Sequence, residues 1–157
     1  MEELNGGELV ERARSIAVAA HAGQLDKAGA DYIGHPARVA ARLDDAEGQA
    51  AAWLHDVIED TRDLEPPRGV TADDLLAQGI PGRVVDAVKA LSHTDGEPRA
   101  RYYERVKAAG DLAVRVKLAD IGDNTDPERL AQLDAATRER LVRKYAAARV
   151  ALGAPGV

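Results

Sequence analysis

One short segment, residues 55–60 with the sequence HDVIED, carries four ionisable side chains in an otherwise apolar stretch. If the segment is helical, at about 100° per residue, the four side chains share one stripe, because Glu59 and Asp60 fall within about 140° of His55. Charges on a mostly buried helix are costly unless they are paired or bind a metal ion. A solvated acidic face, with His55 as the partner of Glu59, is the alternative that periodicity alone leaves open.

Two further ionisable residues lie on other predicted helices, one at a helix start and one inside a buried helix. His35 precedes Pro36 at a helix start, and Asp120 lies in VRVKLADIGDN, whose apolar residues indicate a buried helix. Together with His55 and Asp56, they offer two imidazole nitrogens and two carboxylates. Such a set can hold one divalent ion and leave positions open on an octahedral centre.

Helices must position these residues, because the composition is typical of an all-α protein. Aromatic residues make up 3% of the chain, Phe is absent, and the strong helix formers Ala, Leu, Arg and Glu are abundant. The apolar periodicity predicts a compact helical bundle of seven or eight helices, a single domain over residues 1–157 with its core at roughly 9–152. A surface loop with Pro66 and Pro67 is expected over residues 61–70. The predicted helices span 8–22, 36–43, 46–60, 71–78, 81–92, 98–109, 111–122 and 134–152. Thr71 and Asp74, three residues apart, resemble a capping box at the start of the helix over 71–78.

Charge and hydropathy exclude several classes of protein. The chain has 21 Lys and Arg against 27 Asp and Glu, a net charge of −6, so we expect no general binding to nucleic acid or to anionic membranes. No apolar run approaches the length of about 18 residues that a membrane span needs, and the acidic start is unlike a secretory signal. The absence of Cys excludes disulfides and thiolate metal sites, and it fits the cytoplasmic location that we expect. The sequence leaves a homo-oligomer open.

Four sequence blocks resemble the HD-domain phosphohydrolases and, more narrowly, the hydrolase domain of Rel/Spo proteins and small alarmone hydrolases. The blocks are HAGQ (21–24), YIGHP (32–36), AAWLHDVIEDT (51–61) and VKLADIGDN (116–124), and the resemblance covers roughly residues 9–145. It implies a single HD-type hydrolase domain. A synthetase domain is not expected, because the chain ends where that domain would begin.

The resemblance also implies a reaction and a cofactor. One divalent ion, Mn²⁺ in the nearest relatives, would activate water to release pyrophosphate from the ribose 3′ oxygen of guanosine 3′,5′-bis(diphosphate), leaving GDP. The expected partner is therefore an anionic nucleotide. The implied metal ligands are His35, His55, Asp56 and Asp120, the implied acid–base pair is Glu59 and Asp60, and Asn124 is implied to hold substrate or water. The basic residues that we expect to meet the phosphates are Lys27, Arg101 and Arg105.

The loop after HAGQ departs from the family pattern. Related alarmone hydrolases carry basic residues there, whereas this chain has Asp26 before Lys27, and Asp31 replaces the usual Pro before Tyr32. An acidic residue repels a polyanion and cannot stack on guanine as a guanidinium does. A phosphohydrolase acting on another nucleotide or phosphorylated metabolite therefore stays open. A catalytically silent HD module that binds nucleotide or protein is a third alternative, and the intact set of ionisable residues argues against it.

The two remaining histidines have simpler interpretations. His21 lies on the apolar side of the first predicted helix, which favours a hydrogen-bonded core residue over a metal ligand. His93 follows a predicted helix, where a histidine can cap the helix end.

Overall fold

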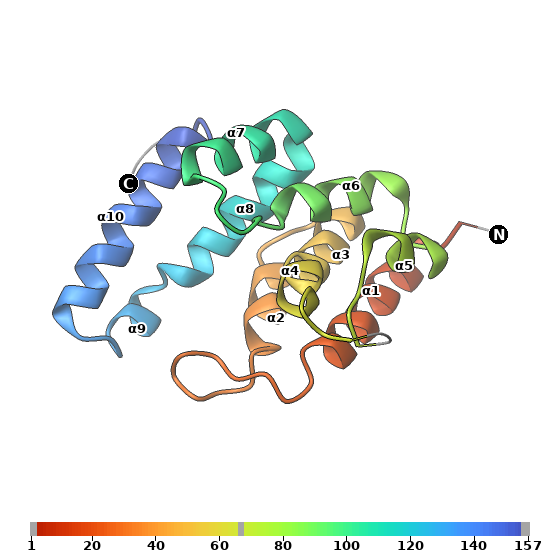
Figure 1. Ribbon diagram of the computed structural model, residues 1–157, viewed down its shortest axis with the longest axis horizontal. Coiled ribbons are helices and arrows are strands. Elements are labelled where there is room, and N and C mark those ends of the chain that lie inside the picture. Colours follow the sequence, from red (N-terminus) through yellow and green to blue (C-terminus); the bar gives the residue numbers. More distant parts are fainter. Residues whose placement is uncertain (1–2, 66–67, 155–157) are drawn as a thin grey trace.

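The computed structural model describes residues 3–65 and 68–154, so Pro66 and Pro67 of the expected surface loop lie outside the described residues. Every regular element in the described ranges is a helix, which confirms the all-α prediction. One isolated β-bridge joins Leu25 to Asp31 in the loop after the first helix. The helices, drawn in Figure 1, are α1 (Gly6–Ala20), α2 (Gly34–Ala41), α3 (Ala46–Leu54), α4 (Val57–Thr61), α5 (Ala72–Ala77), α6 (Gly82–Leu91), α7 (Arg99–Ala109), α8 (Asp111–Asn124), α9 (Pro127–Leu130) and α10 (Ala135–Ala151).

The described residues form ten helices rather than the seven or eight predicted. The helix expected over 46–60 is interrupted at His55 and Asp56, which separate α3 from α4. In a continuous helix the Ala52 carbonyl would accept a hydrogen bond from the Asp56 N–H. Here that carbonyl oxygen lies 2.6 Å from His55 Nδ1, so the side chain competes for the acceptor that would continue the helix. Residues 127–130, outside every predicted helix, form the one-turn helix α9.

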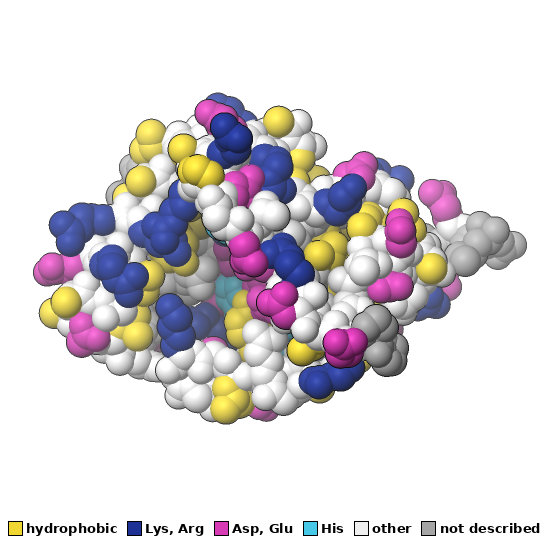
Figure 2. All heavy atoms as spheres, in the orientation of Figure 1, with side chains coloured by type: hydrophobic (Ala, Val, Ile, Leu, Met, Phe, Trp, Pro, Cys, Tyr) yellow, Lys and Arg dark blue, Asp and Glu magenta, His cyan; other side chains and the backbone are white. Residues whose placement is uncertain are grey.

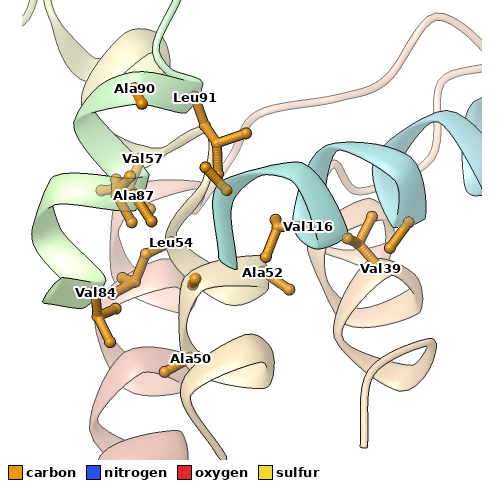
Figure 3. Close-up of a cluster of buried hydrophobic side chains, with 14 of the residues drawn as sticks. Val39, Ala50, Ala52, Leu54, Val57, Val84, Ala87, Ala90, Leu91 and Val116 are labelled. Carbon is orange, nitrogen blue, oxygen red and sulfur yellow. The ribbon is translucent and has the colours of Figure 1, made fainter. Parts of the chain in front are cut away.

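Helix α3 lies at the centre of the fold and packs against α1, α2, α6 and α8. Its buried alanines have small side chains, which allow the neighbouring helices to approach closely. Figure 3 shows Leu54 of α3 beside Val84 of α6, and Val57 of α4 beside Ala87 of α6. Ala52 lies near Val116 of α8 in the same view. One hydrophobic cluster therefore joins the helices that carry the ionisable residues.

Polar side chains begin several of the helices. Thr71 and Asp74 form the capping box that the sequence predicts for α5, with each side chain accepting from the backbone N–H of the other residue. Asp45 caps α3 by accepting from the Gly48 N–H at 3.1 Å. These caps satisfy N–H groups that have no partner inside the helix.

Helix α10 lies at one edge of the molecule in Figure 1. Of its 17 residues only Ala148 is buried, and the helix packs mainly against α7. Most of its Lys and Arg side chains therefore face solvent. Within residues 3–65 and 68–154, no helix combines the length and the hydrophobicity needed to cross a membrane.

We expect Leu54→Ala to lower the free energy of unfolding by about 2–5 kcal/mol, because truncation leaves a cavity in the core. Leu54 is 0% exposed, whereas Leu76 on α5 is 46% exposed and provides the matched control, Leu76→Ala. The control should change the free energy of unfolding by less than about 0.5 kcal/mol. Urea denaturation followed by circular dichroism measures both, and equal effects would contradict the central position of α3.

Candidate active site

Three separate segments bring two imidazole rings and a carboxylate together. His35 lies in the first turn of α2, His55 lies between α3 and α4, and Asp120 lies in the last turns of α8. All three residues are buried, and one ligand atom from each lies within 4.8 Å of the other two. Asp120 Oδ1 is 2.7 Å from His35 Nε2 and 3.3 Å from His55 Nε2. Such a group can hold a metal ion.

In each imidazole, Nδ1 points away from the centre, and its hydrogen bond fixes Nε2 as the atom that faces the centre. His35 Nδ1 lies 2.7 Å from Asp123 Oδ2, and His55 Nδ1 lies 2.6 Å from the Ala52 carbonyl oxygen. A carboxylate and a carbonyl can only accept, so each Nδ1 carries a proton and donates it. In a neutral ring the lone pair of Nε2 then points at the centre, which is the arrangement that binds a metal ion.

Asp56 contributes a second carboxylate to the same centre. Its Oδ2 lies 3.1 Å from His55 Nε2 and 3.8 Å from His35 Nε2. The Tyr32 hydroxyl donates a hydrogen bond to this oxygen. The structure thus brings together all four residues that the family resemblance implies as metal ligands.

Two neighbours on α8 orient Asp120. Lys117, one turn earlier, donates from Nζ to Asp120 Oδ2 at 2.9 Å. Asn124, one turn later, donates from Nδ2 to Asp120 Oδ1 at 3.3 Å. The Lys117 ammonium also lies 5.2 Å from the centre of the Tyr102 ring, which fixes the position of the cation. The carboxylate is therefore held from both sides along the helix.

Asp123 holds His35 from its outer side. Arg38 Nε donates to Asp123 Oδ1 at 2.8 Å, and Arg129 donates to Oδ2. Burial, the strongest influence, raises the pKa of Asp123, but hydrogen bonds from His35 and Arg38 outweigh it and lower the pKa to about 2. Asp123 is therefore ionised at neutral pH and keeps the His35 ring in one orientation.

At the centre, the carboxylates raise the pKa values of the histidines, and the histidines lower the pKa of Asp56. At His35 burial lowers the pKa, but hydrogen bonds to two carboxylates outweigh it and raise the value overall. At His55 burial again lowers the pKa and is the strongest single influence. The charge of Asp56 and the hydrogen bond with Asp120 together outweigh it and raise the pKa well above its usual range. Burial raises the pKa of Asp56, yet the neighbouring His55 brings it down to about 2. Without a bound cation, the centre therefore holds imidazolium–carboxylate pairs.

Glu59 and Asp60 lie on α4, and groups from other segments hold their carboxylates. The His93 backbone N–H donates to Glu59 Oε1 at 2.6 Å, and Gln24 Nε2 donates to Asp60 Oδ2 at 2.9 Å. Burial raises the pKa of both carboxyl groups, and the charge of Asp56 raises it further. A raised pKa suits a carboxyl group that must take up and release a proton near neutral pH.

Arg105 is engaged within the protein rather than free to meet a phosphate. Its guanidinium donates to Glu97 from Nε at 3.0 Å and from Nη2 at 2.8 Å, and to three carbonyl groups at the end of α6. The structure therefore departs from the expected substrate contact, because the donors of Arg105 are already used. These bonds hold the loop between α6 and α7, which presents the His93 N–H to Glu59.

The other basic residues expected to meet substrate lie at the surface. Lys27 in the loop after α1 and Arg101 on α7 are both exposed. In the same loop, Asp26 Oδ1 accepts from the N–H groups of Ala28 and Ala30, at 2.9 and 3.0 Å. The acidic residue that distinguishes this loop thus shapes its turn.

Asp123 is not among the residues expected from the sequence, and neither are the roles of Tyr32 and Gln24. A signal for Asp123 exists in the sequence, since it follows Asp120 by three residues and so lies on the same helix face. For Tyr32 and Gln24 the sequence offers only their membership of the blocks YIGHP and HAGQ. The expectation that His21 is a hydrogen-bonded core residue is confirmed, because it is 2% exposed and its Nδ1 bonds Gln24.

Figure 2 shows histidine side chains at the bottom of a hollow near the middle of the visible face. Acidic side chains lie beside them, and Lys and Arg side chains gather over α10 along the left side of the hollow. The centre therefore opens to solvent, and positive charge lies along one side of its entrance. This arrangement can attract an anion to a centre whose own side chains are partly acidic.

Comparison with known proteins connects the chain to hydrolases of guanosine nucleotides. It is 33% identical over 144 residues, 86% of this chain, to the bifunctional (p)ppGpp synthase/hydrolase SpoT of Escherichia coli. It is 32% identical over 138 residues, 82% of this chain, to the guanosine-3′,5′-bis(diphosphate) 3′-pyrophosphohydrolase of Haemophilus influenzae. The chain belongs to the Rel/Spo hydrolase family. A probable enzyme of the same name from Synechocystis is 31% identical over 141 residues.

The similarity covers only part of those proteins. The chain spans about a fifth of the length of the curated relatives it matches, 20% for the first two and 18% for the third. No protein-family model matches the chain. The family resemblance noted in the sequence is thus confirmed, while the activities in these names are those of the longer proteins.

For the metal-free protein we expect the free energy of unfolding to fall as the pH rises above about 6.5, the pKa of an unfolded histidine. The folded-state pKa values of His35 and His55 are raised, so their stabilisation is complete below that pH and is lost as the pH rises through the folded values. Urea denaturation in a chelator across this range measures the slope. A His93→Gln control should keep the slope, and stability that rises with pH would contradict the expectation.

Proposed function

We propose that the chain is an HD-type, metal-dependent phosphohydrolase that removes pyrophosphate from guanosine 3′,5′-bis(diphosphate) and leaves GDP. The observation that carries this proposal is the convergence of His35, His55 and Asp120 through atoms within 4.8 Å of one another, with Asp56 beside them. The names of the relatives support the substrate, because each refers to hydrolysis of this nucleotide or of (p)ppGpp.

The four residues fit one divalent ion, for which we propose Mn²⁺. Both imidazoles donate from Nδ1 to outer acceptors, so their Nε2 atoms are available as neutral ligands, and the two carboxylates balance the charge of a dication. Two nitrogen and two oxygen ligands, with positions left for water, suit Mn²⁺ better than a closed tetrahedral zinc site. A bound ion lowers the pKa of its water and neutralises charge that develops on the phosphoryl group.

Glu59 and Asp60 are the proposed acid–base pair. Their half-buried carboxylates are held by His93 and Gln24, and burial raises their pKa values. One carboxylate accepts the proton of the attacking water, and a protonated carboxyl group returns a proton to the departing ribose 3′ oxygen. General acid–base catalysis of this kind contributes roughly 10²–10⁴-fold to the rate.

Residues around the opening are proposed to bind the nucleotide. Lys27 and Arg101 are exposed and free to approach phosphate oxygens, while the Asn124 amide lies against Asp120 at the centre itself. Arg105 is left out of this set, because its guanidinium is engaged by Glu97 and by backbone carbonyls.

A hydrolase of another nucleotide or phosphorylated metabolite is the second candidate. The observation that favours it is Asp26, which places a negative charge in the loop where related alarmone hydrolases carry positive charge. A catalytically silent module is the third, and the complete set of ionisable residues at the centre argues against it. The metal chemistry is the same in the first two candidates, so only the substrate distinguishes them.

The test is to incubate the Mn²⁺-loaded protein with a panel of nucleotides and to follow pyrophosphate and orthophosphate release. Pyrophosphate from guanosine 3′,5′-bis(diphosphate), with GDP as the other product, is the expected result. Orthophosphate from other nucleotides would favour the second candidate. No turnover of any nucleotide, together with no retained metal in elemental analysis, would overturn both.

Two variants separate metal binding from proton transfer in that assay. Asp56→Ala should abolish both metal content and turnover, because it removes a proposed ligand. Glu59→Gln should retain the metal and lower the turnover by roughly 10²–10⁴-fold. Asp86→Ala, at an exposed position on α6, is the control and should change neither quantity.

Asp26→Asn tests the charge of the loop while it keeps the turn, because an amide oxygen can still accept from the N–H groups of Ala28 and Ala30. We expect KM for the tetraphosphate to fall by about two- to fivefold, with kcat unchanged, as one half-buried repulsive charge is removed. Steady-state kinetics at low and high salt measure the effect, which salt should diminish. Asp44→Asn, in the exposed connection between α2 and α3, is the control, and an equal change there would contradict a local effect.

A further inference from the structure

Gln24 links the end of α1 to the proposed acid–base pair. Its Nε2 lies 2.9 Å from Asp60 Oδ2, and its Oε1 lies 2.8 Å from His21 Nδ1. Because an ionised carboxylate can only accept, the amide must direct N–H at Asp60 and oxygen at His21. His21 Nδ1 therefore carries the proton of the second bond, and a continuous chain of donors runs from His21 through Gln24 to Asp60.

The buried position of His21 is not explained by packing alone, because an apolar side chain could fill it. Its side chain is fully inaccessible to solvent, and its Nε2 is a buried atom with no hydrogen-bond partner among the described residues. Leaving a buried polar atom unpaired is costly, and an apolar side chain would avoid that cost. The ring contributes through Nδ1, whose hydrogen bond to Gln24 Oε1 prevents the amide from flipping and exchanging its oxygen and nitrogen.

Two backbone hydrogen bonds also hold Gln24 in place. The Gln24 N–H donates to the His21 carbonyl at 3.0 Å, and the Tyr32 N–H donates to the Gln24 carbonyl at 2.8 Å. The rings of Tyr32 and His21 lie 4.9 Å apart between their centres. Gln24 therefore cannot move away from Asp60 without disturbing both ends of the loop that contains Lys27.

We infer that Gln24, oriented by His21, is a positioning residue that holds the Asp60 carboxylate in its reactive rotamer through Oδ2 and leaves Oδ1 for the proton transfer. This inference rests on the proposed function, in which Asp60 exchanges a proton with water or the leaving group. The charged and titratable groups around Asp60 are Glu59 on the same helix, Asp56 and His55 from the interruption after α3, and His21 from the end of α1. The Tyr32 hydroxyl lies in the same surroundings, since the charge of Asp60 raises its pKa.

The sign of the expected effect follows from these neighbours. Burial and the charge of Asp56 raise the pKa of Asp60, while the Gln24 hydrogen bond and the charge of His21 lower it. Removing the amide N–H removes one of the lowering contacts, so the Asp60 pKa must rise. Since a base has to be ionised to act, the acid limb of the rate profile should move to higher pH.

The experiment compares the kcat/KM profile against pH for the Mn²⁺-loaded wild type, Gln24→Met and Gln24→Glu. Gln24→Met removes the donor at similar volume, whereas Gln24→Glu keeps the shape and places a second carboxylate against Asp60. We expect the acid limb to move upward in both variants and further in Gln24→Glu, with at least about tenfold loss of kcat near neutral pH, within the roughly 10²–10⁴-fold that general acid–base catalysis supplies. Metal content should stay unchanged.

Gln49→Met is the matched control. Gln49 is also a half-buried amide with one hydrogen bond, from Nε2 to the Leu43 carbonyl at 2.9 Å, but it lies in α3 away from the interruption. The same substitution there should leave the pH profile and kcat unchanged. A loss of activity in Gln24→Met without any movement of the acid limb would show a merely structural role and overturn the inference.

A readout without turnover separates this inference from the proposed function. Carboxyl ¹³C NMR of the protein loaded with diamagnetic Mg²⁺, with the Asp60 resonance assigned through Asp60→Asn, follows the titration of Asp60 directly. If the wild type hydrolyses no nucleotide but the Asp60 midpoint rises in both Gln24 variants, the proposed function fails and the positioning by Gln24 stands. If the midpoint is the same in all three proteins, the inference is wrong.

Discussion

The geometry of the centre depends on one constraint, which is that the outer nitrogen of each imidazole already has an acceptor. Asp123 takes the proton of His35 Nδ1, and the Ala52 carbonyl takes that of His55 Nδ1. Rotating either ring would leave a buried N–H without a partner, at a cost of about 1–3 kcal/mol. Both Nε2 atoms are therefore kept facing Asp120. This preorganisation fixes how the two imidazole rings lie relative to Asp120.

The same contact at Ala52 also shapes the backbone. Because His55 competes for the carbonyl that would continue α3, the helix is interrupted and α4 begins after Asp56. Glu59 and Asp60 then lie on a short helix of their own, where the loops containing His93 and Gln24 reach them. One local interaction thus links the proposed metal ligands to the proposed acid–base pair.

Charge balance explains why so many basic residues are not free to meet a substrate. The centre concentrates carboxylates in a chain whose net charge is already −6, and buried charges need partners. Lys117 neutralises Asp120, while Arg38 and Arg129 neutralise Asp123. Arg105 is used in the same way, at Glu97. The positive charge left for the proposed nucleotide is therefore at the surface, along the opening and over α10.

The sequence by itself determined the helical class, the capping box at Thr71 and the residue types of the centre, because composition, caps and periodicity reflect interactions within a few residues along the chain. The resemblance to the HD-domain phosphohydrolases also implied that His35, His55, Asp56 and Asp120 belong to one site. Only the tertiary structure decided that the helix over 46–60 breaks, that Arg105 is already engaged, and that Gln24 reaches Asp60. These outcomes depend on hydrogen bonds between segments distant in sequence, and such bonds form only after the helices have packed around α3.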